Sequence, residues 1–159
     1  MQVPAENRRL VKFLVAAAIF FAWATIQGAL QAQQPIYNFL QGPARIIIGA
    51  HVHVGTLGWI SLTLWTVIYY LLPMLGKPIA WPKLINWNFW IFTVAVTITA
   101  ITMITVGIRA GNAFAAGAGG PQLEALMGPY MMVVGILSII CGLVSLLFTI
   151  QILVSASRK

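Results

Sequence analysis

The amino-acid sequence predicts an all-α integral membrane protein, a four-helix bundle with its N and C termini in the cytoplasm. Of its residues, 60% are hydrophobic and 7% are charged, and the mean hydropathy is +0.93. A soluble domain carries about 25% charged residues, so this chain has too few polar groups to cover a surface in water. Its 159 residues suit one domain, residues 1–159, and leave no room for a second sizeable one.

Four apolar segments are long enough to cross a bilayer, which takes roughly 20 residues of helix. The predicted spans are residues 11–32, 44–72, 87–108 and 129–156. The connections contain Pro, Gly and Asn, which favour turns and helix ends. In the longest connection we expect a short interfacial helix over residues 121–126, because proline is well suited to the first turn of a helix.

The first predicted span also has features of a secretory signal peptide, since basic residues precede an apolar stretch. The apolar run is longer than the hydrophobic core of such a signal. We therefore expect a retained first helix that crosses the membrane rather than a segment that is removed from the mature protein.

The basic residues predict the orientation of the four spans. Seven of the nine fall on one side of the membrane: Arg8, Arg9, Lys12, Lys77, Lys83, Arg158 and Lys159. Because positive residues are retained on the cytoplasmic side, both termini are expected in the cytoplasm of a bacterial or archaeal cell. A net charge of +7 would suggest nucleic-acid binding in a soluble protein. Here the charges lie at the ends of apolar segments, so we expect no nucleic-acid partner.

The two histidines, His51 and His53, stand one residue apart near the start of the second predicted span. Ionisable side chains inside a membrane are costly and are therefore candidate functional residues. The alternative is that each histidine forms only a hydrogen bond between helices. Positions i and i+2 of an α-helix point about 200° apart, so the pair cannot converge on one metal ion. Zinc needs three or four protein ligands, and the chain has no other histidine.

A planar cofactor that takes one axial imidazole from a helix face suits this geometry better. Haem accepts a single histidine and surrounds itself with apolar side chains, and the absence of Cys-x-x-Cys-His predicts haem b. Arg45 and Arg109 lie on the same side as the histidines and are candidate partners of the haem propionates; snorkelling to the interface is the alternative. Gly49, Gly55 and Gly58 allow close approach of a ring or of a neighbouring helix.

The stretch HVHVGTLGWISLTLWTVIYYLLP, residues 51–73, resembles the tenth transmembrane helix of subunit I in the haem–copper oxidase and nitric oxide reductase superfamily. In that family a His-x-His pair is followed by Gly and aromatic residues and then by a proline at the inner end. NFWIFTVAVTITAITMITVGIRAGN resembles the eleventh helix, and PYMMVVGILSIICGLVSLLFTIQIL is similar to the last helix of the reductase branch. The likeness covers about residues 45–159.

This resemblance implies particular roles for three residues. In the family the first histidine of the pair ligates the high-spin haem and the second ligates the low-spin haem, so His51 resembles the former and His53 the latter. Arg109 matches the arginines that bind the propionates after the eleventh helix. Subunit I has twelve helices, however, and its copper or non-haem iron is held by three histidines from helices with no counterpart here. We therefore expect no complete terminal oxidase or nitric oxide reductase in this chain alone.

Three sources of a second axial ligand stay open. A homo-oligomer, by default a dimer, would bring histidines of two copies to one haem, because a two-fold axis duplicates any ligand. A methionine is the second source, with Met103, Met131 and Met132 as weak candidates at a similar depth; plain packing is the commoner role of methionine in a helix bundle. The third possibility is a five-coordinate iron with an open position for a gas.

The predicted function is that of a membrane-embedded b-type haem protein in electron transfer or in binding a diatomic gas, NO or O2. The alternative is a cofactor-free structural or assembly subunit of a larger respiratory complex. The aromatic residues near the inner end of the second span are expected to form an interfacial belt, with contact to a quinone as a lesser possibility. They are Tyr69, Tyr70, Trp81, Trp87 and Trp90. Cys141, the single cysteine, is expected to be a core or lipid-facing residue.

Overall fold

The computed structural model describes the backbone of residues 5–158 and the side chains of residues 9–158. Lys159 and the side chain of Arg8, two of the basic residues behind the predicted orientation, lie outside this range. The described elements are α1 (Ala5–Gln31), α2 (Gln34–Phe39), the 3-10 turn η1 (Pro43–Arg45), α3 (Ile46–His53), the π-helix η2 (Val54–Ser61), α4 (Leu62–Met74), α5 (Lys83–Ala115) and α6 (Gly120–Ser157). Within this range the chain is helical throughout, apart from turns and connections.

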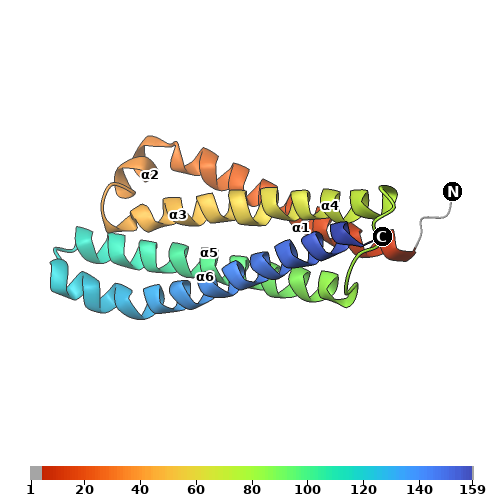
Figure 1. Cartoon of the computed structure of the whole chain (residues 1–159). Coiled ribbons are helices and arrows are strands. Elements are labelled where there is room, and N and C mark those ends of the chain that lie inside the picture. The colour runs from red at the N-terminus through yellow and green to blue at the C-terminus, as the bar shows by residue number, and fades with distance from the viewer. Residues whose placement is uncertain (1–4, 159) are drawn as a thin grey trace.

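Four helical spans are long and apolar enough to cross a membrane, as the sequence predicts. They are Arg9–Gln31, Pro43–Met74, Lys83–Ala115 and Gly120–Ser157. Successive spans run in opposite directions (Figure 1). We call the end at which α1 begins and α6 ends the terminal end, and the opposite end the α2 end. α1 packs along η2 and α4, whereas α5 packs between α3 and α6.

The prediction of a separate interfacial helix over residues 121–126 is wrong. The structure places those residues in the first turns of α6, which continues through Pro129 without a break. Proline removes one backbone donor, but ending the helix there would expose several unpaired backbone groups to an apolar environment. The connection that precedes α6 is therefore short. A short helix does occur in another connection: the segment between the first and second spans, predicted as a turn, contains α2, a helix of six residues.

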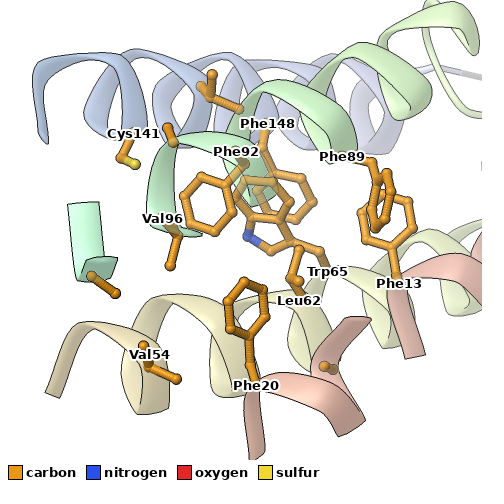
Figure 2. Close-up of a cluster of buried hydrophobic side chains, with 14 of the residues drawn as sticks. Phe13, Phe20, Val54, Leu62, Trp65, Phe89, Phe92, Val96, Cys141 and Phe148 are labelled. Carbon is orange, nitrogen blue, oxygen red and sulfur yellow. The ribbon is translucent and has the colours of Figure 1, made fainter. Parts of the chain in front are cut away.

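Aromatic side chains from all four spans form the core towards the terminal end. Trp65 of α4 stacks on Phe148 of α6 with ring centroids 4.5 Å apart, and it also contacts Phe92 of α5 at 4.6 Å. Phe13 of α1 packs against Phe89 at 4.8 Å. Figure 2 shows these rings together with Cys141, whose predicted place in the core is confirmed by its low exposure. Stacked and edge-on aromatic pairs therefore connect the four spans.

A buried polar network joins the same end of the bundle. Gln151 of α6 accepts a hydrogen bond from Tyr69 at 2.8 Å and donates to the carbonyl oxygens of Ala80 and Trp81 at 2.7 and 3.2 Å. Asn88 donates to the Tyr69 hydroxyl at 3.2 Å. The predicted interfacial position of Tyr69 is wrong, because its ring is only 2% exposed. Its hydroxyl finds a partner inside the bundle and does not need the headgroup region.

The second span changes its winding directly after the histidines. Residues Val54–Ser61 form a π-helix, and the Ser61 hydroxyl donates to the carbonyl oxygen of Thr56 five residues earlier at 3.0 Å. The regular α-helix expected throughout this span is therefore interrupted by a π-helical segment. π-segments are rare and occur often at functional sites. His51 and His53 themselves lie in the α-helical turns before this segment.

Gly58 allows the closest approach of α1 to this π-segment. A Cβ at residue 58 would overlap three carbon atoms of the Phe20 ring, lying closer to them than non-bonded carbon atoms can approach. That ring is itself buried and has little room to move. Replacing Gly58 with alanine is therefore expected to destabilise the protein by about 1–2 kcal/mol through overpacking. The measurement is the midpoint of thermal unfolding in detergent.

Gly135→Ala in α6 is the matched control for this prediction. A Cβ at residue 135 meets no heavy atom within 4 Å. Exchange of glycine for alanine in an open helical position is expected to be neutral or to stabilise by up to about 1 kcal/mol. Equal midpoints for the two variants would contradict the role given to Gly58 in the packing of α1.

Candidate functional site

His51 and His53 lie on different faces of α3, as the i, i+2 spacing predicts. The His51 ring rests against α1, where a Cβ at Gly28 would lie 3.0 Å from its Cε1 atom. His53 lines a cavity whose other walls come from η2, α5 and α6. Each imidazole is half-buried. The structure therefore presents two single imidazoles to two separate environments, and they do not form one two-histidine site.

The His53 ring is oriented by a hydrogen bond within its own helix. Its Nδ1 lies 2.7 Å from the carbonyl oxygen of Gly49. A carbonyl oxygen only accepts hydrogen bonds, so Nδ1 carries the proton in this contact. In the neutral ring, Nε2 is then unprotonated and has a free lone pair. Metal-binding histidines commonly have this arrangement, in which the second nitrogen donates to a backbone carbonyl and fixes the tautomer.

The cavity beside His53 has a volume of about 250 Å³. Its walls are mostly apolar or small, and the lining residues are Leu57, Val96, Thr99, Ser138, Cys141, Gly142 and Ser145. A Cβ at Gly142 would meet no heavy atom within 4 Å, so this wall is open. The site therefore combines a free imidazole nitrogen with low polarity, which is the environment that a haem needs around a single axial histidine.

Thr99, which lines the same cavity, has a buried hydroxyl without a partner among the described residues. The residue is 2% exposed, and its Oγ1 has no hydrogen bond with any described residue. Ser138 and Ser145, on the opposite wall, instead donate to the carbonyl oxygens four residues earlier in α6. An orphaned hydroxyl in an apolar interior is costly. The Thr99 Oγ1 atom is itself closed off by its neighbours, so it is an unsatisfied group within the packed wall of the cavity.

His51 lines a second and larger cavity of about 450 Å³ between α1 and the second span. Its Nδ1 atom is buried and has no hydrogen-bond partner among the described residues. Phe21 and Trp59 flank this cavity, with ring centroids 4.4 Å apart. Gln27 on α1 has a second orphaned atom, Oε1, although its amide nitrogen donates to the carbonyl oxygen of Ile47 at 3.0 Å. The interface of α1 and α3 thus holds two unsatisfied polar atoms.

The three methionine candidates lie in different surroundings. Met103 of α5 is buried, and its methyl group packs against Gly49, one helical turn from His53 on the same face of α3. Met131 and Met132 of α6 are 41% and 64% exposed, and neither lines the cavity beside His51 or that beside His53. The structure therefore places Met103 in the core beside Gly49 and the other two on the outer surface, and none of the three lines a histidine cavity.

Both candidate propionate partners lie at the α2 end and are exposed. Arg109 of α5 hydrogen-bonds to the hydroxyl of Tyr130 on α6, and its guanidinium lies 5.6 Å from the centre of that ring. Arg45 closes the 3-10 turn before α3. The two arginines are thus on the same end of the bundle as the start of α3, but neither lines the cavity at His51 or at His53.

Two features of the site were missed by reasoning from the sequence. A threonine in an apolar helix usually donates to the carbonyl four residues earlier, so nothing in the sequence marks Thr99 as different from Thr97, which does so at 2.8 Å. The role of Cys141 as a cavity wall beside His53 depends on the packing of α6. No group of three His, Cys, Asp or Glu residues within the described side chains is arranged to bind a metal ion. Such a group is not needed for haem.

Comparisons with known proteins show the family of the chain. The profile of the family Cytochrome C and Quinol oxidase polypeptide I matches residues 5–140. The chain belongs to this family. A "Cytochrome c oxidase subunit 1 homolog" of Agrobacterium tumefaciens (strain T37) is 34% identical over 102 residues, which cover 63% of this chain and 19% of that relative. The "Cytochrome c oxidase subunit 1" of Rhodobacter capsulatus is 30% identical over 104 residues, 64% of this chain and 19% of the relative.

A third member of the polypeptide I family, the "Cbb3-type cytochrome c oxidase subunit CcoN1" of Stutzerimonas stutzeri, is 30% identical over 64% of this chain and 22% of its own length. The chain thus spans about a fifth of the length of the curated relatives it matches. No solved structure matches it significantly. Membership of the polypeptide I family confirms the predicted resemblance of the chain to oxidase subunit I and supports a multi-pass protein of a bacterial membrane.

Proposed function

We propose that this chain binds haem b in the membrane through His53 and His51 and serves in electron transfer or in binding NO or O2. The observation that carries the proposal is the orientation of His53. Its Nδ1 is anchored on the carbonyl oxygen of Gly49, and its Nε2 is free beside an apolar cavity. The separate cavity that His51 lines between α1 and the second span supports a second ligand role on another face of α3.

The residues around the two histidines fit the cofactor by their donor chemistry. Bound haem would supply a one-electron redox centre or an iron site for a diatomic gas. His53 would hold the iron through Nε2, while Leu57 and Val96 would exclude water from that face. Arg45 and Arg109 are the cations that would compensate for propionate charge, with the Tyr130 hydroxyl limiting the movement of Arg109. Met103, the buried methionine packed against Gly49, would be the thioether nearest to this helix face as a further ligand.

A complete oxygen- or nitric-oxide-reducing centre is not part of this proposal. The sequence contains two histidines, and they point to different faces of α3. The three histidines that the superfamily uses for copper or non-haem iron have no counterpart among them. We therefore propose that the chain by itself lacks this second metal site and completes its haem coordination with another copy of itself or with a further subunit of a respiratory complex.

The proposed orientation follows from charge. Arg9, Lys12, Lys77, Lys83 and Arg158 lie at the terminal end, and positive residues favour the cytoplasmic side of a membrane. Both termini are then cytoplasmic, and the start of α3 with its histidines lies towards the other side. Electrons or gas would reach the haem from within the bilayer or from that side.

The absorption spectrum of the detergent-purified protein tests the proposed function. After expression with adequate haem supply, we expect a Soret band and, on reduction, the sharp visible bands of a b-type haem. A shift of the reduced spectrum on addition of carbon monoxide would indicate an open coordination position and gas binding. An unchanged reduced spectrum would indicate two protein ligands and electron transfer. Purified protein without a Soret band would contradict the proposal and favour a cofactor-free structural subunit.

A further inference from the structure

A third cavity lies at the terminal end, far along the second span from the histidines. Its volume is about 680 Å³, and it is enclosed by the start of α1, the end of α4 and the connection from α4 to α5. Both polar and apolar side chains line it, among them Arg9, Tyr70, Pro73, Met74 and Ile79. It shares no lining residue with the cavities of His51 and His53.

The wall formed by the α4–α5 connection is rigid. Pro78 and Pro82 restrict its backbone, and Gly76 takes a positive φ of 75° that other residues rarely adopt. Side chains of α6 hold the same connection from behind: the backbone N–H of Ala80 donates to the Ser155 hydroxyl at 2.8 Å, and its carbonyl accepts from Gln151. The cavity is therefore preformed, which lowers the entropic cost of filling it.

Arg9 gives this cavity a positive charge that no described side chain neutralises. Two neighbouring cations at the terminal end are engaged: Lys12 donates to Asn86 at 2.7 Å, and Lys77 donates to the carbonyl oxygen of Arg158 at 2.8 Å. Arg9 lines the cavity and has no hydrogen bond or ion pair with a described side chain. The one acidic residue at this end is Glu6, whose side chain lies outside the described range, against seven basic residues. The cavity therefore favours an anion.

The rim of the cavity is apolar and faces outward. Met74 is 66% exposed and Leu75 is 73% exposed where α4 ends. Tyr70, also exposed, stands beside them with an aromatic ring suited to the headgroup region. A ligand with an anionic headgroup and a hydrocarbon tail would suit this cavity. The headgroup would neutralise Arg9, and the tail would cover the exposed apolar side chains of Met74 and Leu75. Basic pockets between transmembrane helices are known to take the headgroups of anionic lipids.

We propose that the cavity between α1, α4 and the α4–α5 connection is a binding site for one anionic phospholipid, with its phosphate held by Arg9. This site is independent of haem binding. The headgroup is recognised by charge and by the guanidinium geometry, and the acyl chains lie along the exposed end of α4.

Native mass spectrometry of the purified chain in mixed micelles tests this site, with phosphatidylglycerol compared with phosphatidylcholine. We expect one tightly retained phosphatidylglycerol per chain. Arg9→Gln should weaken its retention by about fivefold, the effect of roughly one interfacial charge. Lys83→Gln, which removes a charge at the same end from a residue that does not line the cavity, is the matched control and should retain the lipid.

Two further variants cover the case in which Arg9→Gln folds poorly. Arg9→Lys keeps the charge and should retain most of the binding. Ile79→Trp leaves every charge in place but fills the cavity, so it should reduce lipid retention. Equal retention of the two lipids, or equal losses for Arg9→Gln and Lys83→Gln, would overturn the proposal in favour of diffuse attraction to the basic end.

Two competitors, inorganic phosphate and decylubiquinone, distinguish a phospholipid site from a simple anion site and from a quinone site. Excess inorganic phosphate should not displace phosphatidylglycerol, because it lacks the apolar part. Displacement by phosphate would show an anion site without lipid specificity and overturn the proposal. Decylubiquinone should also leave the lipid in place. Tight binding of decylubiquinone that does not depend on Arg9 would assign the cavity to a quinone and overturn the lipid proposal.

Discussion

Replacing His53 with glycine is expected to lower the haem content of the purified protein by about tenfold or more. The iron would lose the imidazole whose tautomer is fixed by the Gly49 carbonyl, and even the partners that orient a ligand contribute factors of 10–100 to metal affinity. The measurement is the ratio of Soret absorbance to protein in detergent. Adding free imidazole to the His53→Gly variant should restore much of the band, because the cavity beside residue 53 can admit it.

A His51 variant and a control variant at Leu64 complete this experiment. If the two histidines serve two faces, His51→Gly should remove a separate haem signal or change the spectrum without abolishing the contribution of His53. Leu64→Ala, an exposed position on the same span, should leave the haem content unchanged. Unchanged spectra in both histidine variants would refute the ligand assignment. Loss of haem in Leu64→Ala as well would indicate that the assay reports folding and not coordination.

Replacing Gln151 with leucine is expected to destabilise the protein by about 3 kcal/mol or more. Gln151 is fully buried and bonds with Tyr69 and with the carbonyl oxygens of Ala80 and Trp81. Leucine has a similar volume but leaves two carbonyls without their side-chain donor, and each unsatisfied buried group costs about 1–3 kcal/mol. The midpoint of thermal unfolding in detergent should fall by about 10 °C.

Gln41→Leu provides the control for this substitution. Its side chain is exposed and donates only to the carbonyl oxygen of Tyr37, four residues earlier. Its removal should change the midpoint little, because water can replace the lost bond. If Gln151→Leu melts within a degree or two of the Gln41→Leu protein, the buried network does not stabilise the terminal end in the way the geometry indicates.

The spans themselves were predictable from the sequence. Each comprises a long run of apolar residues, and the backbone of such a run satisfies its own hydrogen bonds only by forming a helix. The boundaries were less certain, since α5 extends to Lys83 and Ala115, and α6 passes through Pro129. Several residues in those extra turns, such as Phe114 and Gln122, are exposed, so the turns are held by the backbone hydrogen bonds of the continuing helix. The sequence signals at these positions, proline and glycine, suggested an earlier end.

The opposite placement of His51 and His53 was also predictable, because the angle between positions i and i+2 is a property of the α-helix alone. What surrounds each ring was not. The sequence marks Gly49 as a small residue, but only the fold shows that Met103 packs against it and that its carbonyl orients His53. Likewise, the orphaned hydroxyl of Thr99 depends on how α5 and α6 meet.

The sequence by itself determined that this protein is helical and membrane-embedded, belongs with the oxidase polypeptide I family, and carries two imidazoles on one helix facing apart. The helical, membrane-embedded character and the facing of the two imidazoles follow from local composition and helical period, whereas the family is shown by the match of residues 5–140 to its profile. The tertiary structure alone decided which imidazole nitrogen is free, which polar groups are left without partners, and that Tyr69 is a buried link to Gln151 and no interfacial anchor. Such features arise where residues distant in sequence meet, and a local pattern does not specify those contacts.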